Sequence, residues 1–167
     1  VVGLDPRIEL IPETILSEAL ESENTYAKGI ASAFYKFNKE IIDHIYDIVP
    51  AVKPQVAFYE RFGTDGFDAY IKTCEYAKEK GMIVIGDIKR SDIGSTAEAY
   101  SDFYLGAKEY SLNIDSITVN PYLGRDSLEP FIKNCYDNSK GIFILVKTSN
   151  KSSVDIQDLI CEGRKVY

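Results

Sequence analysis

Five short runs of apolar, mostly β-branched residues recur along this chain, and they constrain the fold more than any other feature of the sequence. Each run is continuously apolar rather than alternating, which is typical of parallel strands that helices cover. Pro50 fits best at the beginning of its strand, where the missing backbone donor matters least. The runs occupy residues 1–4, 48–52, 82–86, 116–119 and 142–146.

Segments with helical periodicity separate these runs. Residues 26–46 and 67–80 carry apolar side chains at three- and four-residue spacing, and Gly81 suits a helix C-terminus. Residues 95–98 match a capping box that opens a third helix, and residues 126–129, followed by a proline, open a fourth. The resulting order, β-α-β-α-β-α-β-α-β, predicts an α/β protein with a parallel sheet.

The sequence favours a barrel over an open doubly wound sheet. No G-x-G-x-x-G follows a strand, so the phosphate cradle of a dinucleotide fold is missing. We therefore predict one domain over residues 1–167 that forms an incomplete (β/α)8 TIM barrel with about five of its eight strands, and we expect the active molecule to be longer. The sequence stops in what resembles the next helix.

Polar residues follow several of the strands, as they do in the active sites of barrel enzymes. They are Asp5, Lys53, Asp87, Lys89, Asn120, Thr148 and Ser149.

Composition limits the classes of partner. A net charge of −7 argues against nucleic acid, and no apolar run is long enough to span a membrane. Three cysteines without a CxxC pair favour a reducing cytoplasm and argue against a zinc site. The single histidine, His44, is expected on a helix surface, so the sequence offers few residues for a catalytic triad that depends on histidine.

The segment V-I-G-D-I-K-R-S-D-I-G-S-T concentrates charge where a buried strand stops. Asp87 and Lys89 are two residues apart, so a strand would project both from one face, and Asp92 follows in the loop. Lys53, after the preceding strand, would extend the cluster to four charges. Carboxylates on both sides would keep a lysine protonated. Such a site suits a reaction in which a carbanion forms and is then protonated, although a solvated turn would show the same charges.

Residues 87–96, D-I-K-R-S-D-I-G-S-T, resemble the D-x-K-R-x-D-I-G-x-T signature of the orotidine 5′-phosphate decarboxylase family, in its longer bacterial branch. Four further segments resemble the family in the same order: V-G-L-D-P, A-V-K-P-Q, T-V-N-P-Y-L-G and V-K-T-S-N. The resemblance implies decarboxylation of orotidine 5′-phosphate to UMP, with neither metal nor organic cofactor. It also implies a cytoplasmic homodimer whose active site is shared across the interface.

The resemblance also implies a role for each site residue. Lys89 would protonate C6 of the pyrimidine, and Asp87 would lie against the substrate carboxylate. Lys53 would bridge Asp87 and a ribose hydroxyl. Asp5 would bind the ribose, and Ser149 would donate a hydrogen bond to the pyrimidine. Asp92, Ile93 and Thr96 would contact the active site of the partner subunit.

Two departures from the family pattern leave alternatives open. Lys151 stands where the family commonly has proline after V-x-x-S-N. The arginine and glutamine that grip phosphate in the family have no counterpart among these residues. The alternatives are a Mg²⁺-dependent sugar-phosphate lyase or decarboxylase on the same scaffold, such as a hexulose phosphate synthase, and an inactive fragment that serves as a binding or assembly module.

Overall fold

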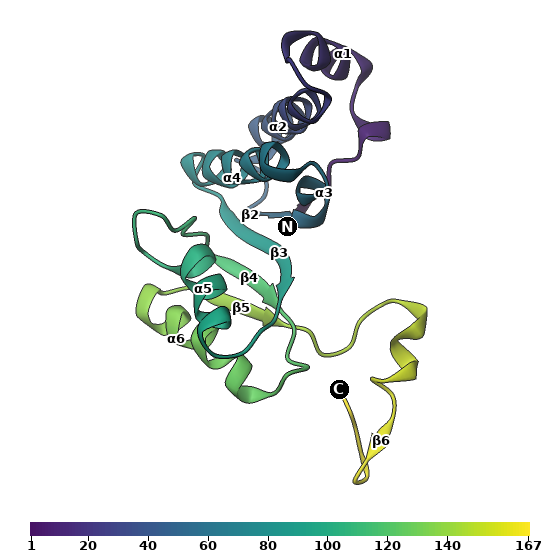
Figure 1. The fold of residues 1–167 in the computed structure, drawn as a ribbon, viewed down its shortest axis with the longest axis vertical. Coiled ribbons are helices and arrows are strands. Elements are labelled where there is room, and N and C mark those ends of the chain that lie inside the picture. The colour runs from purple at the N-terminus through teal and green to yellow at the C-terminus, as the bar shows by residue number, and fades with distance from the viewer.

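A five-stranded parallel sheet is the centre of the fold in the computed structural model, which describes residues 1–167 (Figure 1). The strands pair in chain order, so each is hydrogen-bonded to the strand that follows it in the sequence. All five predicted strands are confirmed, one with the predicted bounds (116–119) and four with shifted ends. They are β1 (Val2–Leu4), β2 (Ala51–Pro54), β3 (Ile83–Arg90), β4 (Ser116–Val119) and β5 (Gly141–Ile144).

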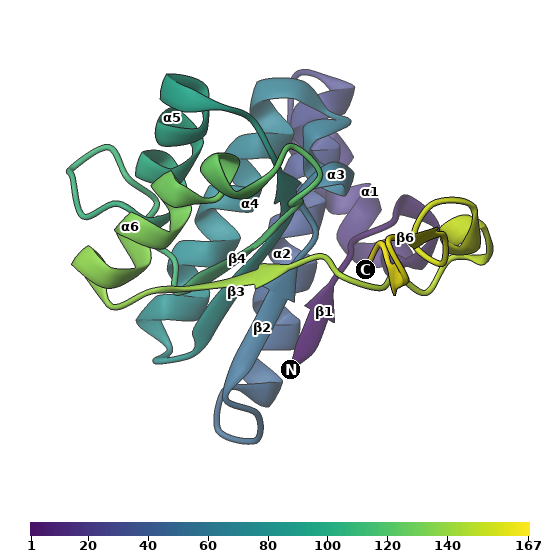
Figure 2. The same cartoon turned by 90° about the horizontal axis from the view of Figure 1, so that it is seen from below.

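Six α-helices accompany the sheet, and its strands are seen in front of them in Figure 2. Helix α4 packs on β2 and β3, α5 on β4, and α6 on β5, while α1 packs on α2. This repeated strand–helix unit is the arrangement of a (β/α) barrel over the part of the ring that is present. The helices are α1 (Glu13–Ser22), α2 (Tyr26–Ile45), α3 (Val56–Glu60), α4 (Gly63–Glu79), α5 (Gly94–Leu105) and α6 (Glu129–Asn138).

Several local predictions were wrong. Residues 95–98 do not cap a helix, because α5 begins one residue earlier, at Gly94 with φ +53°, and Ser95 lies inside its first turn. Residues 126–129 do not open a single helix either, since a 3-10 turn, Arg125–Ser127, precedes α6. The last residues form an antiparallel hairpin of β6 (Ile160–Cys161) and β7 (Arg164–Lys165) rather than a helix.

The core lies between the sheet and the helices. Phe34 of α2 meets Tyr59 of α3 edge-to-face with ring centroids 6.0 Å apart, and Tyr59 meets Tyr70 of α4 at 5.3 Å. All three side chains are almost fully buried. The Nδ2 group of Asn38, also buried, donates a hydrogen bond to the Tyr59 hydroxyl at 2.7 Å. These contacts fix α2, α3 and α4 against one another and therefore hold β2 and β3 in place.

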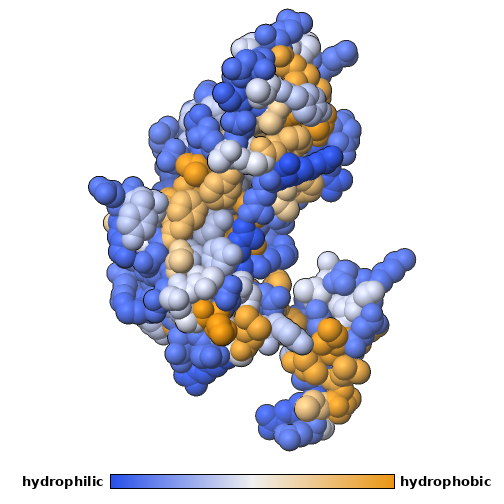
Figure 3. Space-filling model, in the orientation of Figure 1, coloured by the Kyte–Doolittle hydropathy of each residue, from blue (hydrophilic) through white to orange (hydrophobic).

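The outer edges of β1 and β5 carry no further strand, so the sheet is not closed. On β5, Phe143 and Ile144 are 55% and 41% exposed. The segment after β5 extends away from the body of the molecule, and Figure 3 shows apolar residues gathered on it. Its exposed side chains include Ile156, Leu159 and Ile160. No helix of the structure is long and apolar enough to cross a membrane.

Gly66 permits the close approach of α4 to α3, and its replacement tests this packing. A Cβ atom at Gly66 would lie 2.0 Å from the backbone oxygen of Tyr59, so Gly66→Ala forces the helices apart. We expect the free energy of unfolding to fall by about 1–3 kcal/mol in urea denaturation of the full-length protein. This outcome opposes the gain of roughly 0.5–1 kcal/mol that alanine brings to an unobstructed helix position.

Gly141→Ala is the matched control, because a Cβ there would meet its nearest atom, Oγ of Ser116, at an ordinary 3.5 Å. We expect this variant to change the free energy of unfolding by less than about 0.5 kcal/mol. A Gly66→Ala protein as stable as the control would show that α3 and α4 are not tightly packed.

Candidate active site

The C-terminal ends of β2 and β3 bring three charged side chains together. Nζ of Lys53, from β2, lies 2.7 Å from Oδ2 of Asp87, and Nζ of Lys89 lies 2.6 Å from Oδ1 of the same carboxylate. Both Asp87 and Lys89 belong to β3. The predicted convergence of these three residues is confirmed, and we call them the charge array.

Asp87 is the buried centre of this array. Its side chain is 9% exposed, against 33% for Lys53 and 48% for Lys89. Burial raises the pKa of the Asp87 carboxyl, but hydrogen bonds from both lysines and from the Thr118 hydroxyl outweigh it and lower the pKa below its usual value. The carboxylate is therefore charged at neutral pH, and each lysine ammonium lies beside a fixed negative charge.

The backbone at Lys89 departs from a regular strand. Its φ is +46°, a left-handed conformation that is rare outside glycine, and the pairing of β3 with β4 shifts register between Gly86 and Arg90. The prediction that pleat periodicity aims Asp87 and Lys89 to one side thus has the right result for the wrong reason. A bulge, not a regular pleat, directs Lys89. Such a conformation costs on the order of 1–3 kcal/mol and is typical of functional sites.

Two residues that sequence reasoning left without a role contact the array or its backbone. Thr118, on β4, donates a hydrogen bond from its hydroxyl to Oδ1 of Asp87 at 2.9 Å. Arg90 donates to the carbonyl of Ile88 at 3.2 Å, forms an ion pair with Glu60 and lies over the ring of Tyr100. Arg90 therefore ties the end of β3 to α3 and α5. The arginine stands in the signature, but only a structure shows its contacts.

Asp92 does not join the charge array within this chain. Its Oδ1 atom accepts a hydrogen bond from the backbone N–H of Ile93 at 2.8 Å, and no ion pair links it to a lysine. The predicted Asp–Lys–Asp cluster is therefore wrong for a single chain. Ile93 is 57% exposed and Thr96 is exposed on the first turn of α5, and no hydrogen bond or ion pair joins either side chain to the array.

Asp5 and Ser149 follow β1 and β5 as predicted, and both are exposed. No hydrogen bond or ion pair joins either side chain to the charge array. Thr148 instead bonds to the C-terminal segment, because its Oγ1 accepts from Nε2 of Gln157 at 2.7 Å. A cavity of about 700 Å³ lies between this segment and the ends of β4 and β5. Neither Asp5 nor Ser149 is therefore part of the charge array in this structure.

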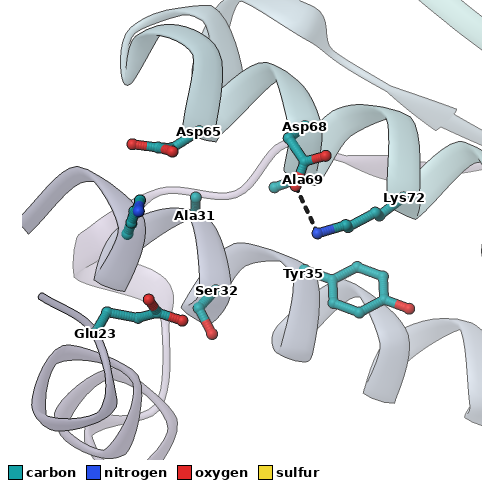
Figure 4. A pocket seen from close by; sticks show the side chains of 9 residues that line it. Glu23, Ala31, Ser32, Tyr35, Asp65, Asp68, Ala69 and Lys72 are labelled. Atoms are coloured by element: carbon teal, nitrogen blue, oxygen red, sulfur yellow. Dashed lines mark ion pairs between the residues drawn. The ribbon is translucent and has the colours of Figure 1, made fainter. Parts of the chain in front are cut away.

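A second cavity, of about 280 Å³, lies among the helices rather than at the strand ends (Figure 4). Its charges are partly paired already, since Lys72 lies 2.6 Å from Asp68. None of its lining residues comes from a strand, so it is separate from the charge array. No group of three or more His, Cys, Asp or Glu side chains converges as a metal site anywhere in the structure.

Comparisons with known proteins show the family to which this chain is similar. A family model described as "Orotidine 5'-phosphate decarboxylase / HUMPS family" matches residues 1–167. Two relatives named orotidine 5'-phosphate decarboxylase, from Rhodopirellula baltica and Caldicellulosiruptor saccharolyticus, are 46% and 40% identical over 99% and 100% of the chain. The chain spans 55% and 57% of their lengths. The structure of Leishmania donovani OMP decarboxylase is 34% identical, with a TM-score of 0.74 over 99% of this chain and 54% of that one.

The lowered pKa of Asp87 predicts how Asp87→Asn affects stability at different pH. A lowered folded-state pKa means that the ion pairs of Asp87 stabilise the protein above pH about 4 and that this contribution is lost as pH falls through the folded pKa. We expect Asp87→Asn to lower the free energy of unfolding by about 1–3 kcal/mol at pH 7, because two lysines lose their counter-charge. The difference from wild type should shrink below pH 4.

Urea denaturation of the full-length protein at several pH values measures this difference. Asp92→Asn is the matched control, since its carboxylate accepts only a backbone hydrogen bond, and its effect should stay within about 0.5 kcal/mol. A destabilisation by Asp87→Asn that does not change with pH would argue against a charged Asp87 in the folded protein.

Proposed function

The chain belongs to the orotidine 5'-phosphate decarboxylase / HUMPS family, and we propose that the protein carrying these residues converts orotidine 5′-phosphate to UMP and CO₂ without a cofactor. The observation that carries the proposal is the charge array, in which one buried carboxylate is held between two lysines. It lies at the C-terminal ends of parallel strands, where barrel enzymes assemble their active sites. The names of the relatives at 40% and 46% identity support the same reaction.

The proposed chemistry uses the array as both a proton source and an electrostatic device. The bond between C6 and the carboxylate carbon breaks, CO₂ leaves, and the electron pair stays on C6. The Lys89 ammonium then donates a proton to C6, and the lysine regains a proton from solvent. Asp87 beside the substrate carboxylate disfavours the bound ground state, and this repulsion disappears when neutral CO₂ forms. The Lys89 ammonium lies 2.6 Å from Oδ1 of Asp87, and this ion pair holds it at the site for this step.

The other site residues complete the substrate site in this proposal. Lys53 links Asp87 to a ribose hydroxyl, Asp5 binds the ribose, and Ser149 hydrogen-bonds the pyrimidine. Asp92, Ile93 and Thr96 reach the active site of the partner in a homodimer. Two observations support this last assignment: Ile93 is 57% exposed, and Asp92 has no cation partner in its own chain. We further propose that the enzyme is cytoplasmic.

A Mg²⁺-dependent sugar-phosphate lyase or decarboxylase is the second candidate, because the family description also includes the HUMPS branch. That reaction passes through an enediolate, which a divalent cation stabilises. The two candidates therefore differ in their response to a chelator. Activity that survives EDTA favours the decarboxylation of orotidine 5′-phosphate.

Lys89→Ala tests the proposed proton donor. We expect the variant of the full-length protein to lose decarboxylation by at least about 10²-fold, because the proposed proton donor is removed and the Lys53 ammonium is bound to the other oxygen of Asp87. The measurement is the fall in ultraviolet absorbance as orotidine 5′-phosphate becomes UMP, with EDTA present. Lys133→Ala is the matched control, since Lys133 lies on α6 with its side chain 76% exposed and pairs only with Asp137. Wild-type turnover in Lys89→Ala would overturn the assignment.

Mixed dimers test whether Asp92 serves the partner's site. Lys89→Ala and Asp92→Asn proteins should each be inactive, whereas a dimer of the two contains one site with both native residues. Random mixing makes half of the dimers mixed, so about a quarter of wild-type activity should return.

The matched control mixes Lys53→Ala with Lys89→Ala. Both lysines contact the same Asp87, so no mixed dimer has an intact site and no activity should return. Mass spectrometry shows whether mixed dimers have formed. Mixed dimers of Lys89→Ala and Asp92→Asn that stay inactive would place Asp92 in the site of its own chain.

A further inference from the structure

The bulge in β3 leaves two backbone N–H groups that need acceptors. In a regular strand the N–H groups of adjacent residues point to opposite neighbouring strands, so only one of these two would face β4, but the register shifts between Gly86 and Arg90. The N–H groups of Ile88 and Lys89 both donate to Oγ1 of Thr118, at 3.1 Å and 3.0 Å. A single side-chain oxygen on the neighbouring strand therefore accepts hydrogen bonds from both N–H groups of the bulge.

The same hydroxyl also fixes the carboxylate of the charge array. Thr118 donates its proton to Oδ1 of Asp87 at 2.9 Å, and that oxygen accepts Nζ of Lys89 at 2.6 Å. A hydroxyl has one proton to donate and two lone pairs to accept with. All three are used here, so the direction of the hydroxyl and the face of Asp87 that it meets are both determined.

The backbone contacts matter because packing does not hold the lysine side chains, whose ammonium groups are fixed by their ion pairs with Asp87. The side chains of Lys89 and Lys53 are 48% and 33% exposed, so their ammonium groups are not held by packing. The left-handed φ of +46° at Lys89 sets the direction in which its side chain leaves the backbone. A strained conformation persists only where its surroundings hold it, and the two hydrogen bonds to Thr118 lie at this point.

We propose that Thr118 is a positioning residue of the active site, which holds the left-handed backbone of Lys89 and the Asp87 carboxylate in one arrangement for proton transfer. The role of this arrangement in decarboxylation rests on the proposed function. The arrangement itself can be tested without substrate.

Thr118→Val removes the hydroxyl and keeps the β-branched shape, whereas Thr118→Ser keeps the hydroxyl. In the full-length protein we expect Thr118→Val to lower kcat for orotidine 5′-phosphate by about 10–100-fold, and Thr118→Ser by less than about threefold. Because a hydrogen bond to the charged carboxylate is lost, the acid limb of the pH profile of kcat should move to higher pH in Thr118→Val. A purely structural role would not move that limb.

Ser116→Ala is the matched control, because Ser116 lies on the same strand and its buried Oγ has no hydrogen-bond partner. This variant should keep the wild-type kcat and pH profile. Thr118→Ala replaces Thr118→Val if the latter does not fold, since the smaller side chain leaves room for water to bond to the two N–H groups. A wild-type pH profile in the folded valine or alanine variant, or an equal loss in Thr118→Ser, would overturn the proposal.

A second measurement separates this inference from the proposed function. The Asp87 carboxyl is titrated by ¹³C NMR in substrate-free wild-type, Thr118→Val, Thr118→Ser and Ser116→Ala proteins. We expect its midpoint to rise only in Thr118→Val. If the midpoint rises while the wild-type protein does not decarboxylate orotidine 5′-phosphate, the proposed function fails and the positioning by Thr118 stands. An unchanged midpoint overturns the positioning, whatever the activity.

Discussion

The burial of a single carboxylate, Asp87, between two lysine ammonium groups is the interaction on which the candidate site depends. An isolated charge in that position would be costly, and a neutral acid would give neither lysine a counter-charge. Hydrogen bonds from Lys53, Lys89 and Thr118 keep the carboxylate ionised despite its burial. They come from β2, β3 and β4, so the charge state of one side chain requires three neighbouring strands in register. The ionised state of Asp87 therefore depends on the order of the strands in the sheet.

This dependence explains why β3 is irregular where the array forms. In β3, Ile83 and Val84 pair in register with β2, Ile85 and Gly86 pair in register with β4, and the register shifts between Gly86 and Arg90. Beyond it, a regular pleat would hold Lys89 by strand pairing alone. The bulge gives its backbone a second anchor, the Thr118 hydroxyl, which also contacts Asp87. The energetic cost of the left-handed backbone at Lys89 is offset by the hydrogen bonds of Thr118, which accepts from the bulge and donates to the Asp87 carboxylate.

The parallel sheet, its strand order and the charge array were predictable from the sequence, because apolar runs mark buried strands and polar residues at their ends meet at one edge. The bulge was not predictable, since position 89 is a lysine and not the glycine that usually indicates a left-handed backbone. Thr118 lies within an apolar run and reads as a core position. Helix α1 was missed although Ile15, Ala19 and Leu20 have helical spacing. The predicted capping box of α5 was wrong because the helix begins at Gly94, which has a positive φ, and not at the serine that follows it.

The candidate residues divide into a fixed set and an exposed set, and the division has a physical cause. Asp87, Lys53 and Lys89 satisfy one another within the chain, so their geometry is complete without any other molecule. Asp5, Ile93, Thr96 and Ser149 are exposed, and Asp92 has only a backbone partner. In the proposed enzyme, a second subunit and a substrate would order these groups, whereas the array is already ordered. Preorganised charge, with binding contacts that form later, suits a site that uses binding energy at the transition state.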